Sequence, residues 1–247
     1  MRTSKSQQDQ NRRQLISAAV DLMTSQGFEA TTMKQIARAA GLGDATIYKY
    51  FPSKEKLVHG FFEMAWEDAL GSWRETPGLE EFQLQESLQW LMDCLLERLL
   101  ADREFVLLAR GLLQRAPLLM LGEQLPGKSL VRGEVLALLE QAEARGEIPP
   151  CPAKQALAAL MGDYSYAVLG YWLRDESEEF GDTTQLLDLS LSLLVLVLQS
   201  GLIGKSLELG GFLLRSSLAR WMQDGGGVLD VLRLARSGLQ GMAGRPA

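Results

Sequence analysis

Side chains that commonly carry out catalysis are scarce in this sequence. His59 is its single histidine, and its two cysteines, Cys94 and Cys151, stand far apart and form no Cys-x-x-Cys pair. The 247 residues contain neither a glycine-rich phosphate loop nor a cluster of metal ligands. This inventory argues against an enzyme, a disulfide framework, a metal site and a bound cofactor, and it favours a structural role for His59.

Long apolar runs are also missing. The most apolar stretch, 189–198, has about ten residues between Asp188 and Gln199, whereas a membrane-spanning helix needs about 20. We interpret this stretch as a buried helix and expect no membrane partner. The chain starts with polar residues and has no apolar stretch before Leu15, which does not resemble a secretory signal, so we expect a cytoplasmic protein.

Alternating runs of β-branched residues are absent as well, so nothing in the sequence predicts a strand. Apolar positions recur every three or four residues, and glycines and prolines separate the segments. The chain is 47% hydrophobic and 23% charged, which is ordinary for a globular protein with a sizeable core. We expect a broken connector over 116–127 and a solvated acidic loop over 175–179. We predict an all-α protein with helices over about 9–26, 32–41, 44–50, 53–75, 80–101, 103–115, 128–145, 153–173, 184–200, 206–223 and 228–240.

Charge is unevenly distributed along the chain. The net charge is −6, but the first 60 residues hold nine Lys or Arg against five Asp or Glu. The remaining residues hold 16 basic and 26 acidic side chains. A basic head on an acidic body is expected when one end of a protein meets a polyanion such as DNA.

Three of the predicted helices, all within the first 50 residues, form a helix-turn-helix pattern. A tight turn with two glycines, 41–43, joins the second and third helices, and Thr32 with Gln35 predicts a capping box at the start of the second. Hydroxyls and amines on the third helix suit phosphates, and its small residues suit base edges in a major groove. The apolar positions that would hold this unit together are Ile36, Ala37, Leu42, Ile47 and Phe51.

Fixed spacings extend this pattern over about 50 residues without a gap. They comprise Gly27-Phe28, Thr32, Ile36-Ala37, Ala40-Gly41-Leu42, Thr46-Ile47-Tyr48, Tyr50-Phe51, Ser53-Lys54 and Leu57. The pattern closely resembles the DNA-binding domain of TetR/AcrR-type transcriptional regulators. The resemblance implies an N-terminal three-helix helix-turn-helix DNA-binding domain over 1–56 and a connecting helix over 53–75. It also implies a larger helical ligand-binding and dimerisation domain over 57–247, whose tail from about 202 runs beyond the usual family length.

The resemblance assigns DNA contacts residue by residue. Thr32 and Lys54 would contact phosphates, Thr46, Tyr48 and Tyr50 would grip the backbone, and Gly43, Asp44, Ala45 and Lys49 would face bases. Many relatives carry serine or a similar capping residue where this chain has Gly43.

Three positions leave alternatives open. Asp44 can accept a hydrogen bond from a cytosine amine or complement the positive end of its helix, and we favour the second interpretation. Tyr48 can pack and contact DNA at once, whereas Lys49 taken alone would be a solvated charge. For Arg12 and Arg13 we favour a solvated helix face over specific DNA contacts.

The resemblance further implies a homodimer on double-stranded operator DNA and a small-molecule effector. The helix over 184–200 is apolar almost all round, and a two-fold four-helix interface with the helix over 153–173 would cover it. For an apolar or amphipathic effector, the candidate contacts are Trp90, Cys94, Phe105 and Tyr164, with plain core as the alternative. A repressor is our first hypothesis, and an activator or a DNA-binding protein without a ligand are the others.

Overall fold

The computed structural model describes residues 5–115 and 125–223, and within them it is helical without strands. This confirms the all-α prediction. The residues between 116 and 124, the predicted break at 225–227 and the predicted helix over 228–240 lie outside this description. The helices are α1 (Lys5–Gln26), α2 (Met33–Ala39), α3 (Asp44–Tyr50), α4 (Lys54–Arg74), α5 (Leu84–Leu100), α6 (Arg103–Arg115), α7 (Lys128–Ala144), α8 (Lys154–Trp172), α9 (Gly181–Gln199) and α10 (Leu202–Gln223), with short 3-10 turns η1 (Leu79–Glu81) and η3 (Glu178–Phe180).

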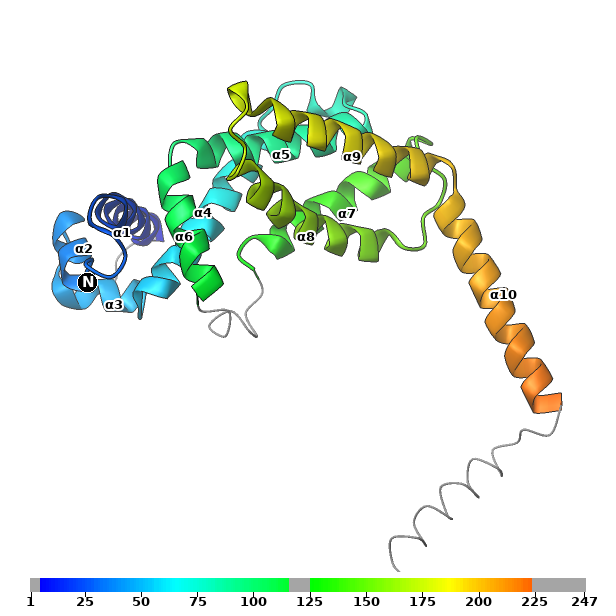
Figure 1. The fold of residues 1–247 in the computed structure, drawn as a ribbon, viewed down its shortest axis with the longest axis horizontal. Helices are drawn as coiled ribbons and strands as arrows, with labels where there is room; N and C mark the ends of the chain where they lie inside the picture. Colours follow the sequence, from blue (N-terminus) through cyan, green and yellow to red (C-terminus); the bar gives the residue numbers. More distant parts are fainter. Residues whose placement is uncertain (1–4, 116–124, 224–247) are drawn as a thin grey trace, which may run out of the picture.

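Figure 1 shows a head of three helices, α1 to α3, at one end of the molecule. Helix α4 leads from this head into a body formed by α4 to α9. Helix α1 begins at Lys5, earlier than predicted. The prediction missed its first turn because residues 5–10 are all exposed and carry no apolar stripe that periodicity could reveal. The boundaries of α3 and α6 agree with the prediction.

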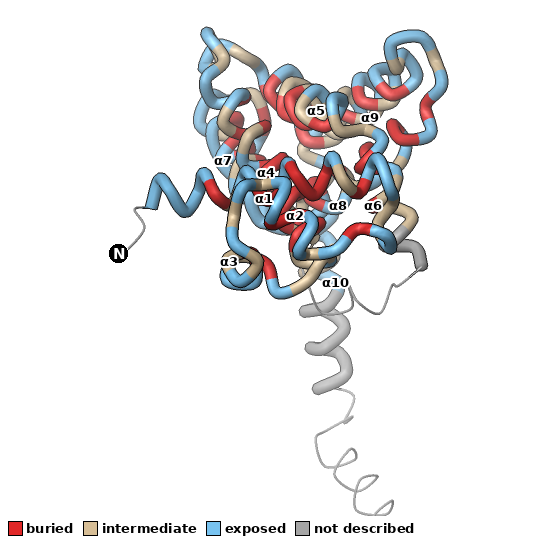
Figure 2. The backbone as a smooth tube through the Cα atoms, turned by 90° about the vertical axis from the view of Figure 1, so that its left-hand side faces the viewer, coloured by how far each residue is buried: buried red, intermediate tan, exposed pale blue. Residues whose placement is uncertain are grey.

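The head is held together by the apolar residues that the sequence singled out. Ile36, Ala37 and Ile47 are fully buried and Phe51 is nearly so, while Leu42 is half-buried against the same core. Gly41 has a φ of 69°, a left-handed conformation that glycine adopts without steric cost, and this allows the tight turn between α2 and α3. Buried positions continue through α4 into the body, whereas α3 is mostly exposed or half-buried (Figure 2).

Helices α8 and α9 each bury one face in the body and expose another. On α9, residues Leu187, Leu191 and Leu198 are buried, whereas another face carries three exposed leucines. Helix α8 is also exposed on one side, at Ala156, Leu160, Ala167 and Tyr171. The exposed leucines of α9 are Leu189, Leu193 and Leu196, with exposed fractions of 59%, 61% and 63%.

Helix α10 leaves the body and extends away from it (Figure 1). Gly201 and Gly204, at its start, lie against the proline-containing linker 149–152. Farther along, Leu207, Leu209 and Phe212 are more than half exposed. Up to residue 213 the tail therefore does not cover the body of its own subunit.

The acidic segment 175–179 differs from the predicted solvated loop. Asp175 is only 7% exposed, and its carboxylate accepts hydrogen bonds from the backbone amides and the hydroxyls of Ser177 and Thr183. These hydrogen bonds hold the pKa of Asp175 well below its usual range. The prediction was wrong for Asp175 because a carboxylate that organises the entry to a helix looks, in sequence, like any other acidic loop residue.

Candidate nucleic-acid interface

Helix α3 is the exposed element of the head that suits a DNA groove. Ile47 is fully buried and anchors the helix, whereas Ala45, Tyr48 and Lys49 are exposed, with Tyr48 at 52%. Thr46 is half-buried. An apolar side chain on one face and small, aromatic and basic side chains on the other fit a recognition helix that is held by the protein and presented to the solvent.

Tyr50, at the end of α3, is tied to α1. It is half-buried, and its hydroxyl accepts a hydrogen bond from Asn11 Nδ2 at 3.2 Å. Asn11 is itself 9% exposed and accepts a hydrogen bond from Gln7 Nε2. Because the Tyr50 hydroxyl accepts this bond, its own proton stays available for an external acceptor such as a phosphate. Asn11 could not be singled out from the sequence, since a single polar residue on a helix reveals nothing about a partner 39 positions later.

An ion pair joins the start of α3 to α2. Gly43 is the N-cap of α3 and, lacking a side chain, makes no capping hydrogen bond of its own. Asp44 follows it, half-buried, with Oδ1 at 3.7 Å from Arg38 Nε. A carboxylate in the first turn of a helix complements the positive helix end, as we favoured, and here it also faces a cation across the turn.

Thr32 forms the capping box that the sequence predicted. Its hydroxyl accepts a hydrogen bond from the Gln35 backbone amide at 3.3 Å, and Gln35 Oε1 accepts one from the Thr32 backbone amide at 2.8 Å. Thr32 is exposed at the start of α2. Its hydroxyl therefore lies on the surface of the head, as a phosphate contact would require.

Lys54 is engaged within the protein. Its Nζ donates a hydrogen bond to the backbone carbonyl of Phe28 at 2.6 Å and lies 4.3 Å from the centre of the Phe28 ring. Ser53 caps α4 just before it by accepting from the Lys56 amide. Lys54 thus holds the turn before α2 against the start of α4, and only its remaining ammonium protons can reach a phosphate.

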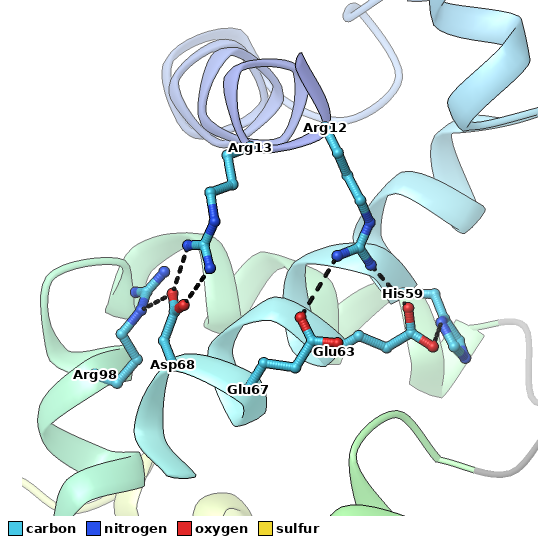
Figure 3. A network of polar contacts seen from close by, with 7 residues as sticks. All are labelled: Arg12, Arg13, His59, Glu63, Glu67, Asp68 and Arg98. Atoms are coloured by element: carbon cyan, nitrogen blue, oxygen red, sulfur yellow. Dashed lines mark hydrogen bonds and ion pairs between the residues drawn. The ribbon is translucent and has the colours of Figure 1, made fainter. Parts of the chain in front are cut away.

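Arg12 and Arg13 bind α4 instead of forming the purely solvated face that we favoured. Arg12 donates a hydrogen bond to Glu63 at 2.9 Å and lies 3.7 Å from Glu67. Arg13 makes two hydrogen bonds to the carboxylate of Asp68, at 2.7 and 3.2 Å. Adjacent residues of α1 therefore contact α4 at two separate places (Figure 3).

His59 lies in the same contact region. Its Nδ1 is 3.6 Å from Glu63 Oε1, on the same helix one turn away. Its side chain is 18% exposed. The structural role expected for this single histidine stays a prediction.

The four candidate ligand contacts are dispersed within the body. Trp90 donates its indole proton to Thr76 Oγ1 at 2.7 Å, and the Tyr164 hydroxyl lies 2.6 Å from Ser190 Oγ. Cys94 is buried, and Phe105 is fully buried with its ring edge-on to that of Phe61. Their part in ligand binding stays a prediction.

Two open cavities lie along the seam between α5 and α9, and none of the four candidates lines them. One has a volume of about 410 Å³ and adjoins the exposed α9 residues Leu193 and Leu196. The other, of about 650 Å³, is polar and lies beside η3 and the start of α9. The described residues include no group of three or more His, Cys, Asp or Glu side chains placed to hold a metal ion.

Family comparisons match both parts of the chain. Residues 15–60 match the family described as "Bacterial regulatory proteins, tetR family", and residues 87–213 match "Tetracyclin repressor-like, C-terminal domain". The regulator UidR of Escherichia coli is 26% identical over 161 residues, which are 64% of this chain and 79% of UidR. The repressor KstR2 of Rhodococcus jostii is 34% identical over 79 residues, 31% of this chain and 39% of KstR2.

Solved structures share the fold. The structure of Salmonella enterica GusR superimposes with a TM-score of 0.54 at 24% identity, covering 77% of this chain and 95% of GusR. That of FadR from Bacillus halodurans gives 0.53 at 20% identity, covering 79% and 97%. Both neighbours are covered almost completely, whereas roughly a fifth of this chain has no counterpart in them.

Proposed function

Because the chain belongs to the TetR family of bacterial transcriptional regulators, which are DNA-binding proteins and not enzymes, we propose that it is a homodimeric repressor that a small apolar or amphipathic molecule releases from its operator. The exposed face of α3 carries this proposal: buried Ile47 fixes the helix while Ala45, Tyr48 and Lys49 face outward. Double-stranded DNA is the partner that such a helix fits.

Contacts in the head divide into those that hold the DNA backbone and those that read bases. The hydroxyls of Thr46, Tyr48 and Tyr50 on the recognition helix can donate to phosphates, and Lys54 adds a positive charge at the start of α4. The Thr32 hydroxyl donates to Gln35 Oε1 at 2.9 Å, so a phosphate would have to take the place of that acceptor. We assign the base-facing positions Gly43, Asp44, Ala45 and Lys49 to sequence readout, with Lys49 as the donor to guanine acceptors.

A second copy of the chain fits the exposed face of α8 and α9. Each helix already packs in the body on one side, and Leu160, Leu189, Leu193 and Leu196 are left more than half exposed. Burying them against the same face of another copy would form a two-fold four-helix interface. Two heads would then contact half-sites about one duplex turn apart.

The apolar character of α9 has one other reading. By length and composition the segment Glu178–Gln199 could cross a membrane, with a mean hydropathy of 1.4 and 28% of its most apolar window buried. Its buried side packs against the body through Leu187, Leu191 and Leu198, as a core helix of a globular protein does. We therefore assign its exposed side to a partner subunit and place the protein in the cytoplasm with its DNA.

Release by a ligand requires that the body and the heads move together. Helix α4 runs as one helix from Lys54 in the head to Arg74 in the body. A molecule that binds one position of α4 better than another would change the separation of the two recognition helices and weaken their match to two grooves. Of the remaining alternatives, an activator would differ only in where its operator lies relative to the promoter.

Fluorescence anisotropy with the DNA beside the protein's own gene tests the proposal. We expect binding that weakens with salt and stays much tighter than binding to a scrambled duplex of equal length. If that DNA holds no operator, binding sites selected from genomic fragments are used in its place. Equal affinity for selected and scrambled duplexes would refute the assignment as a specific regulator, and saturation by effector candidates without loss of operator affinity would favour a regulator without a ligand.

A further inference from the structure

One carboxylate, that of Asp68 on α4, is shared by an arginine of the head and an arginine of the body. Arg13 on α1 reaches it with both terminal guanidinium nitrogens, at 2.7 and 3.2 Å, and Arg98 on α5 donates to it from Nε at 3.1 Å. Arg98 continues to Asp102, one turn along, at 3.1 Å. The contacts Arg13–Asp68–Arg98 thus connect α1, α4 and α5 (Figure 3).

From this arrangement we propose that Asp68 is the positioning residue that fixes the orientation of the DNA-binding head relative to the body. The inference rests on the proposed function, because an orientation matters when two heads must match two half-sites. Asp68 contacts no DNA in this scheme; it acts through Arg13 and Arg98.

The geometry explains why Asp68, and not its neighbours, has this role. Glu63 and Glu67 bind Arg12, so they join the head to α4 only. Asp68 also binds Arg98 of α5, so it joins the head to the next body helix. A single contact between α1 and α4 would allow the helices to pivot about it, whereas the Arg12 and Arg13 contacts together oppose that rotation.

Burial strengthens the body side of the shared contact, where the side chains of Asp68 and Arg98 are 23% and 26% exposed. On the head side Arg13 is 54% exposed, as is Glu67 in the longer contact to Arg12, so the head side depends on the paired hydrogen bonds of Arg13 to one carboxylate. Burial alone would raise the pKa of Asp68, but the hydrogen bonds from Arg13 and Arg98 outweigh it and lower the pKa. The carboxylate is therefore charged at neutral pH and holds two cations in fixed directions.

The inference is tested by measuring the distance from head to body within one chain. Lys34 on α2 and Arg132 on α7 are exposed and can be replaced by cysteine for spin labels, while the native Cys94 and Cys151 are buried. Labelled chains are mixed with an excess of unlabelled chains, so that pulsed electron resonance reports the distance within a single subunit.

We expect Asp68→Asn and Arg98→Gln to broaden this distance distribution and to weaken binding to the selected operator by roughly tenfold, the effect of losing one charge-assisted hydrogen bond. Glu67→Gln is the matched control and should leave both unchanged, because Arg12 keeps its 2.9 Å hydrogen bond to Glu63 and loses only the 3.7 Å contact. In the Arg13→Gln/Arg98→Gln double variant, the loss of operator affinity should be smaller than the sum of the losses in the two single variants. Both arginines act through one carboxylate, so their effects are not independent.

An unchanged distance distribution in Asp68→Asn would overturn the inference, whatever its melting temperature. A lower melting temperature with the parent's distance distribution would show a merely stabilising contact. If the parent protein bound no operator specifically, the proposed function would fail, while the distance measurement, which needs no DNA, would still decide whether Asp68 orients the head.

Discussion

Ile47 and Tyr48 are neighbours on α3 with opposite environments: the first is fully buried and the second is 52% exposed. One step along a short helix therefore separates a residue that holds the fold from a residue that can meet DNA. Substitutions on the exposed side of α3 should alter binding with little effect on stability.

Substitutions of Tyr48 and Lys49 are expected to affect DNA binding in different ways. Tyr48→Ala removes a backbone contact, so binding should weaken by roughly tenfold on specific and scrambled DNA alike. Lys49→Ala removes a base contact, so it should cost about 1–3 kcal/mol on the operator and change the preferred base at one position per half-site. Anisotropy titrations on an operator library measure both, and equal losses of specificity in the two variants would contradict these roles.

Asp93, on α5, lowers the free energy of unfolding by an amount that depends on pH. Burial, with a smaller contribution from the charge of Glu97, raises its pKa to about 6. The folded protein then holds this proton more tightly than the unfolded chain, so the group's contribution to the free energy of unfolding falls as the pH rises from about 4 to about 6.

Asp93→Asn should therefore stabilise the protein at neutral pH. We expect a gain of about 1 kcal/mol at pH 7.5, reduced from the full shift because the side chain is only partly buried, and almost none near pH 4. Urea denaturation at both values measures it. A gain of equal size at both pH values would show that the charge of Asp93 is not the cause.

At the level of elements, α2 and α3 are too short to be stable in isolation, with seven residues each. Their stability comes from the capping box at Thr32, the left-handed turn at Gly41 and the burial of Ile36 and Ile47. Helix α1 packs against α2, and Gly60 of α4 allows Phe51, at the end of α3, to approach closely.

Gly60 and Gly71 lie on the same helix in different surroundings. A Cβ atom at Gly60 would lie 2.6 Å from Phe51 Cε1, whereas one at Gly71 would meet nothing within 4 Å. Gly60→Ala should lower the free energy of unfolding by about 1–3 kcal/mol, because Phe51 must move. Gly71→Ala, its control, should raise it by up to about 1 kcal/mol through helix propensity. Thermal denaturation compares the two variants. If both substitutions stabilise the protein, the Phe51 ring moves aside without an energetic cost.

For the whole molecule, the exposed leucines of α8 and α9 bear on the proposed dimer. Leu193→Glu should increase the dimer dissociation constant by roughly 100-fold or more, since a two-fold interface buries the new charge twice. Leu107→Glu, at a leucine on α6 that is 38% exposed, should leave the dimer intact. Sedimentation equilibrium distinguishes them, and a Leu193→Glu dimer of normal stability would place the interface elsewhere.

Helix α10 is the part of the molecule that the family comparison explains least. The C-terminal family match ends at residue 213, and 77% of this chain covers 95% of the GusR structure. Its start lies on the linker 149–152, and Leu207, Leu209 and Phe212 are exposed. Up to residue 213 this helix therefore leaves the body of its own subunit uncovered.

The local pattern of the sequence determined most of the fold. Periodic apolar residues, glycine and proline breaks, and the capping box at Thr32 placed each described helix, since these signals act over a few residues. The spacings from Gly27 to Leu57 identified the helix-turn-helix, and the buried Ile47 and exposed Tyr48 lie as expected. Predicted helix ends erred where polar or exposed residues begin a helix, as at Lys5.

Contacts between distant positions were decided only by the tertiary structure. The Arg13–Asp68–Arg98 chain joins residues up to 85 positions apart, Asn11 reaches Tyr50, and Asp175 turns inward from a segment that looked solvated. A polar side chain follows no periodicity that names its partner, because hydrogen bonds and ion pairs depend on which surfaces the packed helices bring together. The sequence therefore determined the helices and the DNA-binding head, and the packing of α1, α4 and α5 determined how that head is held.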